Sequence, residues 1–343
     1  MGERDPRCLE ELAAVFFAQS ESGFVPHMRY LHQPSYRCGP RRDASSLTQP
    51  PVYGLVLERL HAAGWQLPDE LISSAMTGIG YLWSHRRTEE GLLAIFHPWE
   101  SGADDSPRWD AWIGTSSWNQ ARFSAVDRFL LRRTHFDSEA AACGSSAFVS
   151  CPAGFNSITA YAAACLGRLT GADAPRHIAL QLSAAIDGSL WNEHEGLWDD
   201  LAKVGPGSSQ AIPTLDGVLG ALVTEDERRA MRALDQVLDP DRFGATYGVR
   251  YVPPKHPAYE PDAYWRGPAW PQMNYLVWLA AHRWNRLDVA LLVQSASWRA
   301  AKSSSLAEYW NPETGAGRGA VPQTWATVVT AMTDDHAPEP ERG

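Results

Sequence analysis

The segment from Tyr264 to Tyr275 has the residue types best suited to bind a small polar molecule. It reads Tyr-Trp-Arg-Gly-Pro-Ala-Trp-Pro-Gln-Met-Asn-Tyr, and so combines four aromatic rings with an arginine and two prolines. Pro268 and Pro271 predict a loop or the first turn of a helix, because only there does a missing N–H cost nothing. A sugar stacks its C–H bonds on flat rings while its hydroxyls need hydrogen-bond partners. The segment therefore predicts a carbohydrate site, and the competing interpretation is that its rings cap the hydrophobic core.

A second candidate stretch runs from His97 to Asp110 and holds four carboxylates, two tryptophans and an arginine. A carboxyl group beside other carboxylates and against indole rings has its ionised form disfavoured, which suits a general acid at neutral pH. The alternative is an exposed acidic turn whose Ser and Asp side chains cap a helix. The flanking tryptophans favour a functional role over that alternative.

A third stretch begins at Glu308, which is followed by Tyr309 and Trp310 and then by a glycine-rich loop. Glycine lets the backbone approach a ligand closely, so Glu308 is a candidate second carboxylate. Glu308 is a candidate only because the acidic stretch from His97 to Asp110 offers a second carboxylate with which it could act. Glu313, within Asn-Pro-Glu-Thr-Gly, indicates ordinary turn chemistry.

Three short motifs resemble those of family 63 glycoside hydrolases and their trehalase relatives. They are Glu100-Ser101-Gly102-Ala103-Asp104, Tyr264-Trp265-Arg266-Gly267-Pro268-Ala269-Trp270 and Glu308-Tyr309, and they occur in the family's order. The similarity covers about Leu12 to Val329 and is greatest to the bacterial mannosylglycerate and glucosylglycerate hydrolases. It implies an all-α (α/α)6 barrel, the six-hairpin glycosidase fold, and an inverting α-glycosidase without metal or organic cofactor.

The resemblance also implies roles for individual residues. Asp104 matches the family's general acid and Glu308 its general base. Inversion needs room for a water molecule, so their carboxyl groups are expected roughly 6.5–9.5 Å apart, at one end of the barrel. The remaining matched positions are walls of the sugar subsite (Gln49, Trp99 and Trp270) and positions near the aglycone (Tyr264, Trp265 and Gln323).

Two departures from the family pattern bear on the substrate. Relatives carry a Trp-Asp motif upstream of the segment that resembles Gly23–Met28, and nothing before Met28 matches it. This predicts that the first barrel helix and part of the sugar subsite are missing. Glycerate-specific relatives present an arginine and a tyrosine after the segment that matches Arg133–Asp137, and residues 138–148 contain neither. The second departure argues against a charged glycerate aglycone.

Composition excludes several classes of partner. The formal net charge of −10 argues against nucleic acid and anionic membranes, because binding phosphate needs clustered Lys and Arg. The only apolar run near the N-terminus, Leu12–Ala18, is short and lacks a basic leader, so it predicts neither a signal peptide nor a membrane span. Five cysteines without metal-binding spacing predict free thiols in a reducing cytosol. The expected partner is a small carbohydrate.

The elements that must position these stretches are helices. Helical periodicity recurs along the chain, and strand-like alternation is scarce, with Tyr247–Val252 the best candidate. Long Gly/Pro/Trp-rich connections between paired helices favour a toroid with loops on one face. We expect a single domain over 1–333 and a disordered tail over 334–343. The predicted helices are 8–19, 51–63, 70–83, 117–132, 156–169, 177–190, 225–237, 275–284 and 287–300.

Together these observations predict an inverting glycosidase that hydrolyses a small α-glucoside or α-mannoside. In this hypothesis Asp104 protonates the leaving oxygen and Glu308 deprotonates water on the opposite ring face. One alternative is a truncated, non-catalytic sugar-binding or scaffold relative, which the missing Trp-Asp motif favours. A generic helical scaffold is the least favoured hypothesis, since it leaves three ordered motifs to chance.

Overall fold

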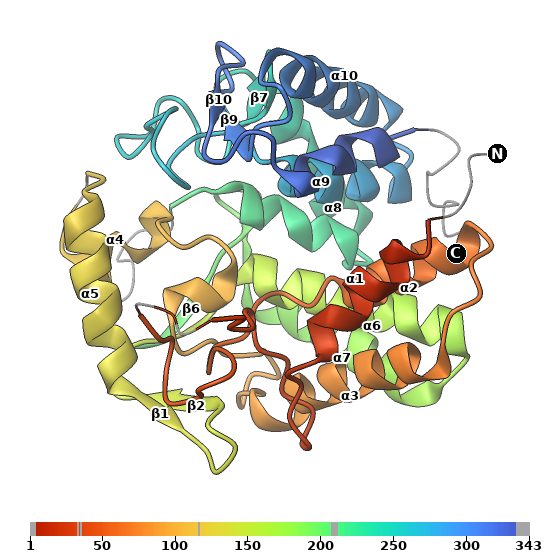
Figure 1. Cartoon of the computed structure of the whole chain (residues 1–343). Coiled ribbons are helices and arrows are strands. Elements are labelled where there is room, and N and C mark those ends of the chain that lie inside the picture. The colour runs from red at the N-terminus through yellow and green to blue at the C-terminus, as the bar shows by residue number, and fades with distance from the viewer. Residues whose placement is uncertain (1–4, 33, 35, 116, 207–211, 334–343) are drawn as a thin grey trace. The chain divides into compact units, whose positions relative to one another are not determined.

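The computed structural model describes residues 5–32, 34, 36–115, 117–206 and 212–333. Every helical segment expected from the sequence is present within these residues, with ends displaced by a few residues (Figure 1). The expected tail 334–343 lies outside the described residues. The helices are α1 Arg7–Phe16, α2 Tyr53–Ala62, α3 Asp69–His85, α4 Asp110–Ile113, α5 Gln120–Arg133, α6 Ala153–Thr170, α7 Asp173–Ser189, α8 Glu227–Leu238, α9 Pro271–Arg283 and α10 Leu287–Ser303.

Short 3-10 helices and two-stranded ladders occupy the connections. The 3-10 helices are η1 Pro98–Ser101, η2 Pro107–Trp109, η3 Leu215–Leu222 and η4 Thr324–Ala331. All the ladders are antiparallel. They pair β1 Thr134–Phe136 with β2 Ala142–Ser145, β3 Val149–Cys151 with β6 Leu201–Val204, β4 Trp191–Asn192 with β5 Leu197–Trp198, β7 Gly244–Ala245 with β8 Gly248–Val249, and β9 Tyr309–Trp310 with β10 Gly317–Arg318.

The strand expected over Tyr247–Val252 is mostly not a strand, because only Gly248 and Val249 pair, with β7. The alternating large residues that follow serve as anchors instead. Arg250 forms an ion pair with Glu313, and Tyr251 hydrogen-bonds Asp216. Buried side chains in an irregular loop thus produced the pattern of a half-buried strand.

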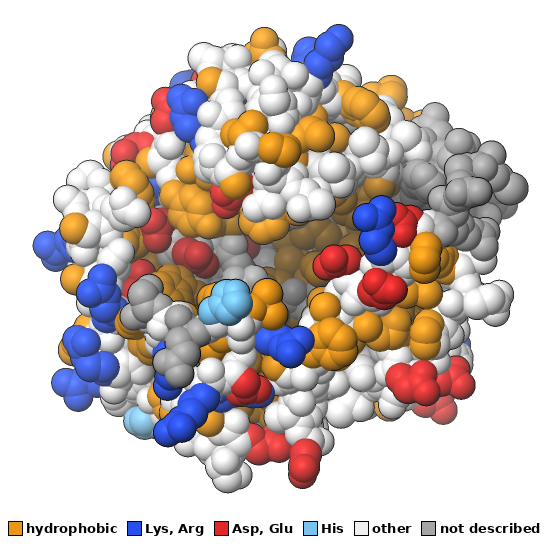
Figure 2. Space-filling model, in the orientation of Figure 1, with side chains coloured by type: hydrophobic (Ala, Val, Ile, Leu, Met, Phe, Trp, Pro, Cys, Tyr) orange, Lys and Arg blue, Asp and Glu red, His pale blue; other side chains and the backbone are white. Residues whose placement is uncertain are grey.

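Contacts divide the chain into two compact units. The first comprises residues up to Asp104, Ser124–Ala185 and Leu201–Gly205, and the second comprises Asp105–Phe123, Ile186–Asp200 and the residues from Pro206 on. The single domain expected over 1–333 stays a prediction. No helix among the described residues is long and apolar enough to cross a membrane. Acidic, basic and apolar side chains are interspersed on the face shown in Figure 2.

In the first unit, α2 lies beside α6 (Figure 1). A Cβ at Gly54 would overlap the carbonyl of Ala162, so the packing of these helices requires glycine there. The apolar faces of α1 and α3 complete this core. Its buried members include Leu12, Phe16, Tyr53, Leu57, Leu71, Ile79, Ala162 and Leu166.

In the second unit, α9 is the central helix and contacts α10, η3 and η4. It begins at Pro271, with Trp270 in extended conformation at the N-cap. A proline at the first helical position gives up an N–H that has no intrahelical partner, and its fixed φ suits the helix. The aromatic segment before Pro271 is therefore held on the loop that enters this buried helix, as the sequence predicted.

Candidate active site

Glu100 is a structural carboxylate rather than a catalytic one. It is completely buried, and its two oxygens accept hydrogen bonds from Arg86 at 2.9 and 3.0 Å, from the Thr48 N–H at 3.1 Å and from the Phe96 N–H at 2.7 Å. Burial lowers the pKa of Arg86, but the Glu100 carboxylate outweighs it, so that the pKa is raised. The buried contact between Arg86 and Glu100 fixes the start of the motif that ends at Asp104.

His97 and Gln49 hold Trp99 in place within the first unit. The His97 Nε2–H donates to the Asp127 carbonyl at 3.0 Å, and its Nδ1 accepts the Trp99 N–H at 3.2 Å. The His97 and Trp99 rings meet edge to face at 4.8 Å. Gln49 donates from Nε2 to the Trp99 carbonyl at 3.4 Å. Two of the expected subsite residues, Gln49 and Trp99, thus lie side by side.

We expect His97 to make stability depend on pH. Burial lowers the pKa of His97 to about 4, whereas an unfolded histidine has a pKa of roughly 6.5. Between these two pKa values the unfolded chain binds more protons than the folded chain. The contribution of neutral His97 to stability is therefore complete above pH 6.5 and is lost as the pH falls towards 4. Unfolding midpoints at pH 7 and pH 5 should differ less in His97→Gln than in the wild type. Exposed His194→Gln should keep the wild-type difference, and an equal difference in all three proteins would contradict this account.

Two further carboxylates of the acidic stretch have defined partners in the second unit. Asp105 accepts the Trp118 indole N–H at 2.7 Å. Burial raises the pKa of Asp105, against the lowering effect of that hydrogen bond. Asp110 forms a bidentate ion pair with Arg266 at 2.5 and 2.8 Å, and Arg266 is fully buried. The arginine of the aromatic segment therefore anchors the end of the acidic stretch.

The aromatic segment forms a stack of three rings with Trp270 in the middle. The Trp265 and Trp270 rings are 3.9 Å apart at 9°, and Trp270 and Tyr309 are 4.5 Å apart at 24°. Tyr264 meets all three rings edge-on. Trp270 is only 1% exposed, so both of its faces are covered by protein. Its edge carries Nε1, which is buried and has no hydrogen-bond partner among the described residues. Contact of these rings with a sugar stays a prediction.

Trp270→Ala should therefore lower the free energy of unfolding by about 3–5 kcal/mol, as large-to-small core substitutions do. The removed ring leaves Trp265 and Tyr309 without their stacking partner. Trp298→Ala is a suitable control, because Trp298 is 44% exposed and should change stability little. Chemical denaturation measures both variants. A Trp270→Ala protein of wild-type stability would show that the stack does not support the fold.

Glu308 is held by its backbone and by one carboxylate oxygen. The N–H of Glu308 donates to the Ala320 carbonyl at 2.9 Å, and its own carbonyl accepts the Trp325 indole N–H at 3.0 Å. Oε2 accepts the Ala320 N–H at 3.0 Å. Oε1 accepts no hydrogen bond within the part of the chain that the structure describes. Glu308 thus presents one fixed and one available carboxylate oxygen.

Gly319 makes this arrangement possible. The residue adopts φ +71°, and a Cβ built on it would overlap Oε2 of Glu308. The sequence suggested that this loop approaches a ligand, but here the close approach is to the carboxylate itself. Gly319→Ala should displace the Glu308 carboxylate and reduce kcat more than it raises KM. Gly188→Ala, which has open space around it, is the control. Unchanged kcat in a folded Gly319→Ala protein would contradict a positioning role.

Gln323 and Glu313 serve local structure. The Gln323 side chain accepts the Thr324 N–H at 2.9 Å as the N-cap of η4, and its backbone N–H donates to the Leu306 carbonyl at 2.8 Å. The expected turn at Asn311 is present, and its Glu313 additionally pairs with Arg250 at 2.5 and 2.8 Å. The role of Gln323 near the aglycone stays a prediction.

The two Trp-Asp pairs of the chain have structural partners in the second unit. Trp109 and Trp198 are buried, Asp110 pairs with Arg266, and the Trp198 indole donates to Asp187 at 3.0 Å. Asp199 accepts from Asn192 at 2.6 Å. Burial raises the pKa of Asp199 to about 6.

The structure places the expected site residues in two groups. Gln49, Trp99 and Asp104 belong to the first unit, and the group with Glu308 belongs to the second. That second group also contains Tyr264, Trp265, Trp270 and Gln323. The distance expected between the carboxyl groups of Asp104 and Glu308 stays a prediction. Sequence reasoning missed Tyr309 as the third ring of the stack, although its position directly after Glu308 was a signal.

Comparison with solved structures bears on the fold. The GH63 mannosylglycerate hydrolase from Thermus thermophilus in complex with glucose aligns with a TM-score of 0.78 and 24% identity, over 95% of this chain and 87% of that one. Neutral trehalase Nth1 from Saccharomyces cerevisiae aligns with a TM-score of 0.55 and 13% identity, over 84% and 62%. These likenesses confirm the expected helical (α/α)6 fold class.

Relatives in sequence cover nearly the whole chain. Mannosylglycerate hydrolase MGH1 of Selaginella moellendorffii is 27% identical in an alignment 380 positions long, which covers 95% of this chain and 75% of the relative. The glucosylglycerate hydrolase of Mycolicibacterium hassiacum is 28% identical in an alignment 399 positions long, which covers 94% of this chain and 86% of the relative. A family model described as the mannosylglycerate hydrolase MGH1-like glycoside hydrolase domain matches residues 3–326. The match confirms the resemblance and the prediction of a glycoside hydrolase rather than a non-catalytic scaffold. The chain belongs to the MGH1-like glycoside hydrolase family.

Proposed function

We propose that this glycoside hydrolase cleaves a small α-mannoside or α-glucoside in a single inverting displacement, with Asp104 as general acid and Glu308 as general base. Asp104 gives its proton to the glycosidic oxygen as the bond from that oxygen to C1 breaks. Glu308 removes a proton from water, whose oxygen attacks C1 from the opposite ring face and forms the β-anomer. Asp104 then carries the negative charge and Glu308 the proton, and exchange with solvent restores both.

The observation that carries this proposal is the environment of Glu308. Its Oε2 is fixed by the Ala320 N–H, while Oε1 accepts no hydrogen bond among the described residues. A general base must be within hydrogen-bond reach of the water that it deprotonates, and Oε1 is suited to that. On the acid side, Glu100, Asp105 and Asp110 are each bound to a structural partner. The assignment of Asp104 rests on its match to the family's general acid.

The relatives' names point to a hexose linked to glycerate, whereas this chain lacks the arginine and tyrosine expected after Asp137. Residues 138–148 comprise the β1–β2 turn, β2 and the three residues that follow β2, and they carry no cation. Glu139, on that turn, instead accepts a hydrogen bond from Ser20 at 2.8 Å. We therefore propose that a charge on the aglycone contributes little to recognition. Five free thiols support a reducing compartment such as the cytoplasm.

A matched pair of substrates tests this proposal. kcat/KM is measured on α-mannosylglycerate and α-mannosylglycerol, and on the corresponding glucosides, which differ within each pair only in the aglycone carboxylate. The proposal predicts release of mannose or glucose, with values within about tenfold between the members of a pair, a difference of about 1.4 kcal/mol. No release of sugar from any of the four compounds by the folded chain would overturn it. A strong preference for the glycerate compounds would retain the catalytic roles and reject the neutral aglycone.

A further inference from the structure

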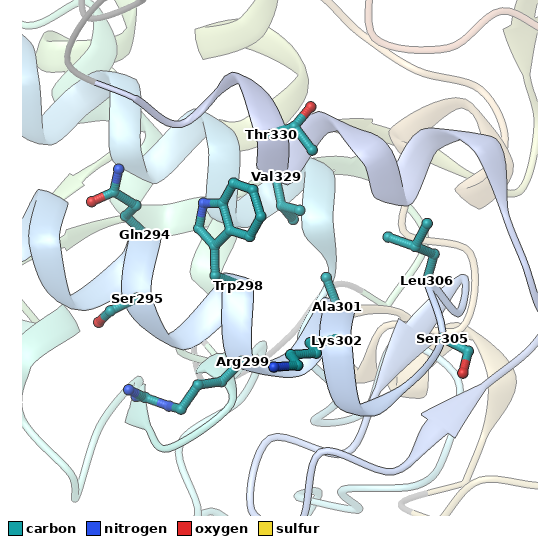
Figure 3. A pocket seen from close by; sticks show the side chains of 10 residues that line it. All are labelled: Gln294, Ser295, Trp298, Arg299, Ala301, Lys302, Ser305, Leu306, Val329 and Thr330. Carbon is teal, nitrogen blue, oxygen red and sulfur yellow. The ribbon is translucent and has the colours of Figure 1, made fainter.

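A cavity of about 780 Å³ lies between α10 and η4, within the second unit (Figure 3). This volume is typical of sites that take small molecules. Trp298, Leu306, Val329 and Ala301 supply its apolar surface. The Trp298 indole is directed toward Val329, as Figure 3 shows, and Trp298 is 44% exposed although it is the largest of these side chains. An aromatic ring left open beside a cavity is a surface on which a flat apolar group can pack.

The charged residues of the lining are both cations. Arg299 and Lys302 lie along α10 after Trp298, and no Asp or Glu lines the cavity. Lys302 forms no ion pair with any residue that the structure describes. Arg299 donates from Nε and Nη2 to the Thr246 carbonyl, at 3.2 and 3.0 Å, so its guanidinium is fixed in direction. Unneutralised cations at the rim of an apolar cavity favour an anion over a neutral molecule.

Two walls of the cavity also hold Glu308. Ser305 and Leu306 adopt φ angles of 56° and 59°, a left-handed conformation that is uncommon for residues other than glycine. They lead directly into Glu308. The other wall is η4, in which Val329 lines the cavity and Trp325 donates its indole N–H to the carbonyl of Glu308. A molecule bound in the cavity would therefore contact both segments that hold the backbone of Glu308.

We propose that this cavity binds a small amphipathic anion, an aromatic or branched aliphatic body with one carboxylate, sulfonate or phosphate group, and that its occupancy alters turnover through the Glu308 segment. The apolar body packs on Trp298 and Val329. The anionic group faces Lys302. The effect on turnover rests on the proposed role of Glu308 as general base, whereas binding does not depend on that role.

Fluorescence of two related probes tests the binding. 1-Anilinonaphthalene-8-sulfonate carries an anionic group, and N-phenyl-1-naphthylamine has the same ring system without it. The wild type should bind the sulfonate at least about tenfold more tightly than the amine. Trp298→Ala should weaken both about tenfold, whereas Lys302→Gln should weaken only the sulfonate, each factor being equivalent to about 1.4 kcal/mol. Leu180→Ala and Lys255→Gln, at exposed positions outside the cavity, are the controls.

Wild-type affinity for the sulfonate in Trp298→Ala would overturn the site. So would markedly tighter binding by a chain that ends at Thr333, because the occupant would then be the chain's own acidic segment 334–343 rather than a free ligand. Concentration-dependent dimerisation that the probe reverses would likewise assign the cavity to a second copy. In the activity assay, saturating sulfonate should change kcat in the wild type and not in Trp298→Ala. Binding without any change in kcat would reject the effect on turnover, and no turnover in either protein would count against the proposed function alone.

Discussion

Asp104→Asn and Glu308→Gln should each lower kcat on a cleavable α-glycoside by about 10²–10⁴-fold, which is the usual contribution of a general acid or base. Both replacements keep the shape of the side chain and remove its ability to exchange a proton. The circular dichroism spectrum and the unfolding midpoint should stay close to wild type. Glu90→Gln, which alters an exposed carboxylate paired with Lys203, is the control and should leave kcat unchanged.

The leaving group distinguishes the two roles. The 2,4-dinitrophenolate released from a 2,4-dinitrophenyl α-glycoside departs without protonation, so this substrate should restore most of the rate lost in Asp104→Asn and little of that lost in Glu308→Gln. Azide, which attacks without giving up a proton, should partly rescue Glu308→Ala and not Asp104→Asn. Turnover at the wild-type rate in either isosteric variant would remove that residue from catalysis. The reverse pattern of rescue would exchange the two roles.

Arg86→Met should lower the free energy of unfolding by about 3–5 kcal/mol, because it leaves the Glu100 carboxylate buried without its cation. Both side chains of this pair are completely inaccessible to solvent. The guanidinium also lies 4.3 Å from the centre of the Phe96 ring. Urea denaturation followed by circular dichroism measures the loss. Because Glu100 begins the motif that ends at Asp104, kcat should fall as well at temperatures where the variant remains folded.

A second substitution separates the cost of an unpaired charge from the loss of volume. Arg86→Met combined with Glu100→Met removes both charges and should recover a large part of the lost stability, since apolar replacements of buried ion pairs are often tolerated. Arg228→Met breaks the exposed pair with Glu193 and should leave the unfolding midpoint near wild type. A double variant no more stable than Arg86→Met would show that packing, rather than charge, sets the loss.

The helices were predictable because their periodicity is a local property. Each expected helix is present, and the loop position of the aromatic segment followed from Pro268 and Pro271. The individual contacts of the site were not predictable, because they join residues distant in sequence. Nothing in the acidic stretch indicates that Glu100 binds Arg86 or that Asp110 binds Arg266.

Two features of the candidate site show where sequence reasoning reached its limit. The tryptophans at 265 and 270 indicated a flat surface for a sugar, but a sequence does not reveal that Tyr309 covers the other face of Trp270. The glycine-rich loop indicated close approach, but that approach is made to Glu308 by Gly319. The residue types predicted that these segments form a site. Tertiary packing decides which ring faces and which carboxylate oxygens remain available to a ligand.

The configuration of the first sugar released tests the central claim most directly. Proton NMR spectra recorded within the first minutes of hydrolysis of an α-mannoside or α-glucoside distinguish the anomeric protons before mutarotation mixes them. Attack by a water molecule activated by Glu308 inverts C1, so the β-anomer should appear first and the α-anomer only later, at the rate of mutarotation. Initial formation of the α-anomer would contradict the single displacement by Asp104 and Glu308.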